Sequence, residues 1–226
     1  MEIRLQCPIK RGIKVKKWYA TNTDLKSLSD FFLCQSQGFG ENPQTYAFLG
    51  LNGHNGLDIV YENGTEVFAS HDGIVEFAGQ DSYTNGPAGL GIVIKGTGFK
   101  SIYWHLLEFK ITPGQQVKAG QLIALGDNTG FSSGPHLHWG IKLLDNSGNV
   151  LNRDNGFDGA IDPTPFVTWW NTMDKDLTRR LVEKLYKTWL QKDLSGVDYW
   201  ANLIDSPEKL ENFIDQKLSD VREAVK

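Results

Sequence analysis

Cysteine is scarce in this chain of 226 residues, which contains only Cys7 and Cys34. Two thiols cannot supply a zinc-finger ligand set, and neither lies close in sequence to a histidine. One disulfide between them is allowed but not required, because a chain of this length can bury enough apolar surface to fold without covalent cross-links. A metal site of the zinc-finger type is therefore excluded.

Long apolar runs are also missing. No stretch approaches the roughly 20 apolar residues that cross a bilayer. The first eight residues lack the apolar segment of about 7–15 residues that signal peptides contain. We therefore predict no membrane insertion and no signal peptide in the chain as given. If the protein acts outside a cytoplasm, another route must carry it there.

A strong excess of basic charge is absent too, since 23 Lys and Arg oppose 27 Asp and Glu, for a net charge of −4. This balance argues against nucleic acid as a partner. Basic residues crowd only into the first seventeen positions. We interpret them as the solvated face of a short β-hairpin; an arm that binds an anionic polymer is the less favoured alternative.

Between residues 64 and 144, short β-rich runs alternate with turns that contain glycine. Strands of this length at regular spacing are typical of an all-β sheet or a barrel-like sandwich. The runs expected to form strands are Thr65–Ala69, Gly73–Ala78, Gly91–Lys95, Ser101–Leu107, Gln116–Leu125 and His136–Leu143. The stretches 36–63, 80–90 and 127–135 are rich in turn residues and are predicted to be irregular.

The pattern changes after Thr172. Apolar residues then recur every three or four positions, which is the mark of an amphipathic helix. They are Leu177, Leu181, Val182, Leu185, Tyr186 and Trp189. A second short helix is expected over Val197–Ile204, and a third begins at Ser206 and Pro207, a capping residue followed by proline. Residues 174–226 are therefore predicted to form a small C-terminal helical module.

Histidines are few but grouped. Four of the five fall in the three segments His54–Asp58, Tyr103–Leu106 and Gly134–His138. Residues two apart in a strand project from the same face. His136 and His138 would therefore point into one site, while Leu137 turns toward the core.

Such a set of side chains suits a zinc centre. Zinc binds imidazole nitrogen and carboxylate oxygen tetrahedrally, and a catalytic site leaves the fourth position to water. His54 and Asp58 lie four apart in a glycine-containing segment and can converge on one side of it, and His138 can complete the ligand set. His105 and His136 are then uncoordinated imidazoles, able to take a proton from the attacking water or to donate hydrogen bonds to an oxyanion.

The remaining histidine and the tryptophans near the site have simpler interpretations. His71 is expected to be only a turn residue, because Asp-Gly follows it. Trp104 and Trp139 are predicted to pack rather than to bind sugar. Strand alternation predicts that both lie on the sheet face opposite His105 and His138.

Together, these residues resemble the lysostaphin/LytM-type zinc endopeptidases, which cleave peptide cross-links of bacterial peptidoglycan. The resemblance runs in chain order over residues 36–166 and rests on several separately spaced motifs. The motifs are Phe39-Gly40, His54-x-Gly56-x-Asp58, Gly64-Thr65-x-Val67-x-Ala69 with Asp72-Gly73-Ile74-Val75, Tyr103-x-His105-Leu106, Gly114-Gln115-x-Val117-x-Ala119-Gly120-Gln121-x-Ile123-Ala124, and Thr129-Gly130-x-Ser132-Ser133-Gly134-Pro135-His136-Leu137-His138.

The resemblance implies a mainly β fold, an antiparallel barrel-sandwich-like metallopeptidase core. It implies one zinc ion per chain with His54, Asp58 and His138 as metal ligands. The same resemblance implies that His105 and His136 are the catalytic histidines. Every family position recognisable at the metal site is present in this sequence.

The implied peptidase domain is 36–168, and an N-terminal segment, 1–35, is expected to pack on it. One departure from the family is Glu41-Asn42-Pro43, where a basic residue is common, and the resemblance leaves open whether Tyr46 is the family's substrate-facing tyrosine. The module 174–226 has a weaker resemblance to helical modules of secreted or surface bacterial proteins. It is expected either to cap the core or to bind the wall or another protein.

We therefore predict a zinc-dependent endopeptidase that acts on bacterial peptidoglycan at the cell wall, in the manner of a phage lysin. The alternative is a non-catalytic wall-binding or hydrolase-activating protein on the same fold, which would predict a lost ligand, and none is lost. A lipoyl- or biotinyl-type carrier is rejected. Its hairpin resembles Gly114–Ile123, but Lys118 lacks the expected setting and the histidines would go unexplained.

Overall fold

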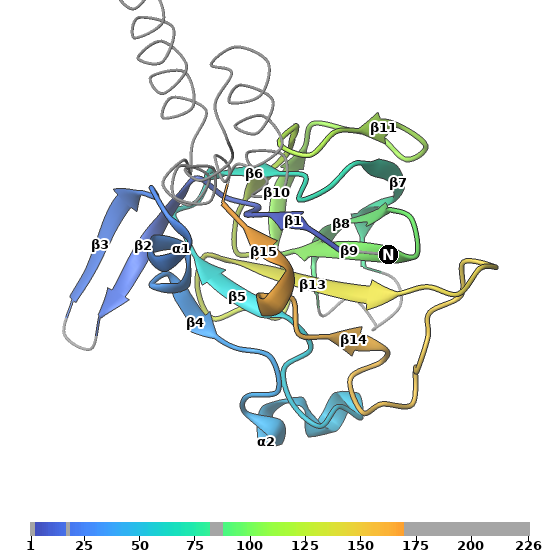
Figure 1. The fold of residues 1–226 in the computed structure, drawn as a ribbon. Coiled ribbons are helices and arrows are strands. Elements are labelled where there is room, and N and C mark those ends of the chain that lie inside the picture. The colour runs from blue at the N-terminus through green and yellow to red at the C-terminus, as the bar shows by residue number, and fades with distance from the viewer. Residues whose placement is uncertain (1–2, 17–18, 82–87, 170–226) are drawn as a thin grey trace, which may run out of the picture. The chain divides into compact units, whose positions relative to one another are not determined.

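The computed structural model describes residues 3–16, 19–81 and 88–169, and the chain divides after Trp169 (Figure 1). The helices expected within 174–226 therefore lie outside the described residues. Within the described part, no helix is both long and apolar enough to cross a membrane. The division of the chain into domains stays a prediction.

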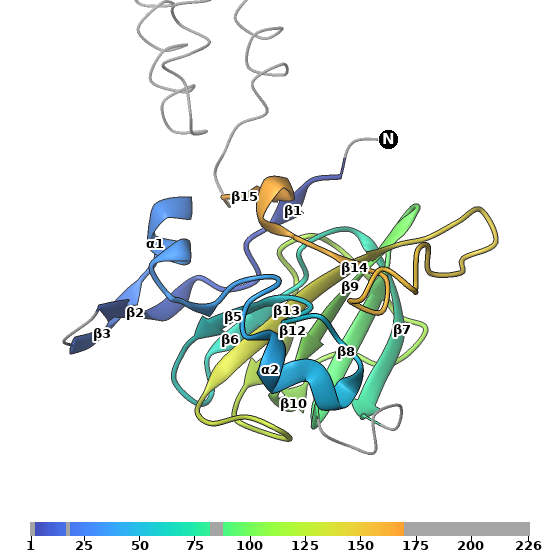
Figure 2. The ribbon, with the colours of Figure 1, turned by 90° about the horizontal axis from the view of Figure 1, so that it is seen from below.

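Two antiparallel sheets form the centre of the described unit (Figures 1 and 2). The larger sheet has the order β11-β7-β8-β9-β13-β5-β4, with β14 beside β13, and the smaller has the order β10-β12-β6. Their strands are β4 Gln35–Gln37, β5 Leu57–Val60, β6 Glu66–Phe68, β7 Gly73–Gln80, β8 Leu90–Lys95, β9 Phe99–Trp104, β10 Leu106–Phe109, β11 Gln116–Val117, β12 Leu122–Gly126, β13 His136–Leu143 and β14 Ala160–Ile161. The mainly β, antiparallel fold predicted from the sequence is confirmed.

Alternation along the strands separates a buried face of the larger sheet from an outer face. On β13, Leu137, Trp139 and Ile141 are 0% exposed, whereas His136 and His138 on the other face are partly exposed. Burial of these large apolar side chains is the main favourable contribution to folding, at roughly 1.5–3 kcal/mol for each side chain. The core therefore lies on the Trp139 side, and the histidines project from the opposite side.

The predicted position of Trp104 is wrong. The β9–β13 register pairs Trp104 with His138, and Tyr103 with Trp139. Directly opposed residues on antiparallel strands share a face. Trp104 therefore lies on the outer face with His138, while Trp139 lies on the buried face as predicted.

The error arises at His105, whose φ of 66° lies in the left-handed region. This conformation is uncommon for a residue other than glycine, and it ends the alternation of β9. The chain leaves the larger sheet at Trp104 and enters the smaller sheet at Leu106. The expected single strand Ser101–Leu107 is therefore two strands, and Gln116–Leu125 divides in the same way between β11 and β12.

The N-terminal segment joins the sheets through backbone hydrogen bonds. β1 (Leu5–Gln6) pairs in parallel with β15 (Val167–Thr168), and Ile9 bridges to Val67. The expected hairpin is present farther along the chain, as β2 (Arg11–Lys16) and β3 (Tyr19–Asp24). The short helix α1 (Leu28–Phe32) follows, capped by the Ser27 hydroxyl, which accepts a hydrogen bond from the Asp30 amide.

The stretch 36–63 is less irregular than predicted. It contains α2 (Pro43–Tyr46), the 3-10 turn η1 (Ala47–Leu49) and β5. A second 3-10 turn, η2 (Thr164–Phe166), precedes β15. Cys7 and Cys34 are both free and buried, so they form no disulfide.

Candidate metal centre

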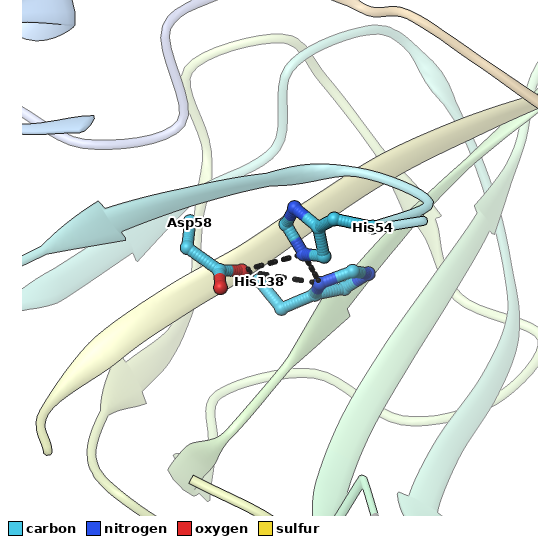
Figure 3. A group of neighbouring side chains, drawn as sticks. All are labelled: His54, Asp58 and His138. Atoms are coloured by element: carbon cyan, nitrogen blue, oxygen red, sulfur yellow. Dashed lines mark hydrogen bonds and ion pairs between the residues drawn. The ribbon is translucent and has the colours of Figure 1, made fainter. Parts of the chain in front are cut away.

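Two neighbouring strands place a histidine and an aspartate side by side. The β5–β13 register pairs Asp58 with His138, and the Nδ1 of His138 lies 3.2 Å from the Oδ1 of Asp58. His54 precedes β5, and its Nε2 lies 3.0 Å from the same Asp58 oxygen and 2.8 Å from the Nδ1 of His138. One ligand atom from each of the three residues lies within 4.8 Å of the others, as Figure 3 shows.

The orientation of His54 is set by the backbone of the preceding loop. Its Nδ1 lies 3.2 Å from the carbonyl oxygen of Gly38, to which it can donate a hydrogen bond. The proton is then on Nδ1, and the lone pair of Nε2 points toward Asp58 and His138. The His54 side chain is fully buried, so this orientation is held on all sides.

Gly56 leaves room for the ring of His138. A Cβ at this position would lie 2.8 Å from the Cε1 of His138 and 2.8 Å from the carbonyl oxygen of Trp139. Real Cβ atoms do not approach other heavy atoms so closely, so any side chain here would displace the imidazole. Gly56, between His54 and Asp58, is therefore needed because only glycine leaves space for the His138 ring.

The three side chains fit a divalent cation. The Asp58 carboxylate offers only lone pairs, and His54 turns its unprotonated nitrogen toward the group. Burial raises the pKa of Asp58, but the close contacts with His138 and His54 outweigh it and hold this pKa far below the usual range. Burial also lowers the pKa of His138. Two neutral imidazoles and one carboxylate are a ligand set that zinc prefers.

Two further histidines lie beside this group. The ring centroids of His105 and His136 are 4.5 Å apart, and His105 lies 6.3 Å from His138. The Nδ1 of His105 lies 2.7 Å from the carbonyl oxygen of Thr129, so this nitrogen donates and Nε2 keeps its lone pair. Burial, with the neighbouring charges of His136 and His138, lowers the pKa of His105 to about 4.

His136 is held in a similar way from the other side. Its Nδ1 lies 2.8 Å from the carbonyl oxygen of Gly134 and 3.1 Å from the hydroxyl of Ser132. Its Nε2 lies 3.5 Å from the Oδ2 of Asp58. The structure therefore brings together all five residues that the sequence singled out, three as a possible ligand group and two beside it.

Sequence reasoning left out two residues that support these histidines. Tyr46, which remained undecided, stacks on His54 with ring centroids 5.3 Å apart, and its hydroxyl donates to the side-chain oxygen of Gln37. Burial, together with the charge of Asp58, raises the pKa of this tyrosine. Thr129 orients His105 and also anchors the loop to the backbone of Leu106 through its hydroxyl. Its place in the last motif was the available signal.

His71 is more than a turn residue. It is buried, its Nδ1 lies 2.8 Å from the carbonyl oxygen of Asp72, and its Nε2 lies 2.7 Å from the hydroxyl of Ser101. Ser101 in turn contacts the hydroxyl of Tyr103, which also binds Ser70. This polar network lies on the buried face of β9, away from the candidate metal centre.

All five site residues fall within residues 52–152, which match the family model of Peptidase family M23. This region of the chain belongs to peptidase family M23. The resemblance stated from the motifs is thereby confirmed.

Two curated relatives are endopeptidases by name. Glycyl-glycine endopeptidase ALE-1 of Staphylococcus capitis is 35% identical over 133 residues, which are 58% of this chain and 33% of that protein. Peptidoglycan DD-endopeptidase ShyA of Vibrio cholerae is 40% identical over 131 residues, 56% of this chain and 30% of that protein. This chain thus spans about a third of the length of these curated relatives.

A solved structure is also similar to part of this chain. The catalytic domain of the antimicrobial peptidase lysostaphin from Staphylococcus simulans is 31% identical, with a TM-score of 0.46. The similarity covers 58% of this chain and 90% of that domain.

Proposed function

We propose that this protein is a zinc-dependent endopeptidase that hydrolyses peptide cross-links or stem peptides of bacterial peptidoglycan. The observation that carries the proposal is the convergence of His54, Asp58 and His138, with His105 beside them. The match of residues 52–152 to peptidase family M23 supports it, as does the name of the relative ShyA, a peptidoglycan DD-endopeptidase.

His54, Asp58 and His138 would hold the zinc ion. When bound, it would polarise the scissile carbonyl and lower the pKa of a water molecule toward roughly 7. Gly38 supports this role because its carbonyl oxygen keeps the proton of His54 on Nδ1. The ligand set is thus prepared before any ion arrives.

His105 and His136 would carry the protons. The low pKa of His105 keeps its ring neutral at pH 7, and its Nε2 lone pair can accept the proton of the attacking water. His136, fixed at Nδ1 by Gly134, can donate a hydrogen bond from Nε2 to the oxyanion when protonated, and the proton that His105 accepted from water can then pass to the leaving amine. The His105 and His136 rings lie close enough to each other to act on the same peptide bond of the substrate.

The test measures the metal content of the protein and its cleavage of purified peptidoglycan sacculi. Cleavage is detected as the release of new amino groups. We expect about one zinc per chain, loss of cleavage with a chelator, and recovery when zinc is returned. His71→Gln is the matched control, because this buried histidine lies outside the group and its loss should leave the zinc content unchanged.

Two results would contradict the proposal. Absence of zinc from the purified protein would mean that the ligand group has been misread. Bound zinc without cleavage of any sacculi would favour the wall-binding or hydrolase-activating alternative.

Residues 174–226 are proposed to bind the wall or a partner protein, and their deletion should then weaken attachment to sacculi more than it slows cleavage of soluble fragments.

A further inference from the structure

A tryptophan lies next to the candidate metal centre on the outer face of the larger sheet. The register places Trp104 directly opposite His138 on the adjacent strand. Side chains in such pairs have Cβ atoms about 4.5–5.5 Å apart and point the same way. The Cβ atom of Trp104 therefore lies beside that of His138, a candidate metal ligand.

The indole of Trp104 lies across the next strand. A Cβ on Gly91 of β8 would lie 1.8 Å from the Cε3 and 2.0 Å from the Cζ3 of this indole. Its six-membered ring therefore rests against the backbone of Gly91. Phe77 of β7 lies on the far side, with ring centroids 6.0 Å apart and planes at 59°. Glycine inside a strand often marks such a close approach.

Packing of the core does not account for this tryptophan. Tyr103 and Trp139, two large aromatic residues of the buried face, are 0% exposed and fill the space under the sheet. Trp104 is on the other side and remains partly exposed, as do Ile102 beside it on β9 and Val93 on β8. A rigid, flat and apolar surface is thus available to solvent beside His138.

We infer that Trp104 is a substrate-contacting residue, whose indole receives the uncharged peptide residue next to the scissile bond. An indole face binds apolar C–H surface and offers no partner to a carboxylate, so the site selects an uncharged residue there. Gly91 is a positioning residue, because its missing side chain lets the indole lie flat. This inference rests on the proposed peptidoglycan substrate and names a determinant of its binding.

The first experiment measures cleavage of sacculi at increasing sacculus concentration. Trp104→Ala should raise the apparent KM about tenfold or more, the usual scale for loss of a central aromatic contact, with kcat changed less and zinc content unchanged. Ile102→Ala is the matched control, since Ile102 lies on the same face of β9 but one pair farther from His138. It should leave the apparent KM within about twofold.

The second experiment measures binding without turnover. The full chain carrying His136→Ala is sedimented with sacculi, with and without Trp104→Ala. We expect the bound fraction at a fixed sacculus concentration to fall about tenfold when Trp104 is absent. If the wild-type protein cleaves no sacculi but its binding depends on Trp104, the proposed hydrolysis is contradicted and this inference is supported. Equal binding and an unchanged KM in Trp104→Ala would overturn the inference.

A double-mutant cycle tests the role of Gly91. Gly91→Ala should mimic Trp104→Ala because its methyl group displaces the indole. In a chain that already carries Trp104→Ala, the added Gly91→Ala should have little further effect on the apparent KM. Fully additive effects would show that Gly91 does not act through the indole.

Discussion

The Nδ1 of His54 lies 3.2 Å from the carbonyl oxygen of Gly38, and this contact decides which ring nitrogen faces Asp58 and His138. The imidazole is fully buried and cannot turn without breaking the contact. One backbone carbonyl thus selects the tautomer that a cation requires. The ligand group depends on the loop before β5 as much as on the strands themselves.

Removal of a single ligand should empty the site. His138→Ala leaves only His54 and Asp58, and two ligands hold zinc much more weakly than three. We expect less than about a tenth of the wild-type zinc content after dialysis, together with loss of cleavage. Metal analysis and sacculus cleavage measure both effects. Activity that survives without metal would rule out the assigned chemistry.

Replacement of His105 or His136 should reduce cleavage without reducing the zinc content. His105→Ala and His136→Ala each leave His54, Asp58 and His138 intact, so zinc content should stay near one per chain. Cleavage should fall by roughly 10²–10⁴-fold, the usual contribution of a positioned acid or base. The same preparations serve for metal analysis and for rates. Zinc lost in step with activity would instead assign these histidines to the ligand set.

Acid should destabilise the fold partly through His71. Burial lowers the pKa of this histidine, so the unfolded chain binds its proton more readily than the folded chain does. Its contribution to the free energy of unfolding is therefore complete above about pH 6.5 and is lost as the pH falls below that value toward the folded pKa. The loss is at most about 1.4 kcal/mol per pH unit.

Urea unfolding of wild-type protein and His71→Gln between pH 7.5 and 5 measures this contribution. The histidines of the metal centre are common to both proteins, so their contributions cancel in the difference between the two free energies of unfolding. This difference should shrink as the pH falls, because only the wild-type protein loses the contribution of His71. A difference that stays constant over this range would mean that His71 is not the titrating group.

The hydroxyl of Tyr103 should contribute measurably to stability. It accepts a hydrogen bond from the Ser70 amide at 2.9 Å and contacts Ser101 at 3.0 Å, all in the buried interior. Tyr103→Phe leaves the buried Ser70 amide without this partner, and we expect a loss of about 1–3 kcal/mol in the free energy of unfolding with unchanged zinc content.

Tyr61 offers a matched control for that measurement. It is equally buried, and its hydroxyl lies near the backbone of Asp127 without a formed hydrogen bond in the described structure. Tyr61→Phe should therefore change the free energy of unfolding by less than about 0.5 kcal/mol. Equal losses in the two variants would show that the Ser70–Tyr103 network carries no special stability.

Much of this site could be predicted because its chemistry is local in sequence. The pair His136 and His138 shares a strand face by simple alternation, and the structure keeps that face. His54 and Asp58 have a spacing that an extended segment can bring together. These predictions needed no knowledge of distant contacts, although the roles assigned to the residues stay predictions.

What could not be predicted depends on tertiary structure. Nothing in the residue type of His105 announces a left-handed backbone, yet this conformation moves the chain from one sheet to the other. Alternation counted across His105 therefore assigned Trp104 to the wrong face. The interior position of His71 was hidden in the same way, because its partner Ser101 lies 30 residues away in the sequence.

The pairing of β1 with β15 has a consequence for synthesis of the chain. The Thr168 hydroxyl donates to the carbonyl oxygen of Leu5 across 163 positions, and the Cys7 amide donates to the carbonyl oxygen of Thr168. At roughly 5–20 residues per second, a ribosome needs on the order of ten to thirty seconds to make that interval. β1 lacks its β15 partner for all of that time, so the edge that β15 later covers is open to chaperones and proteases while the chain is made.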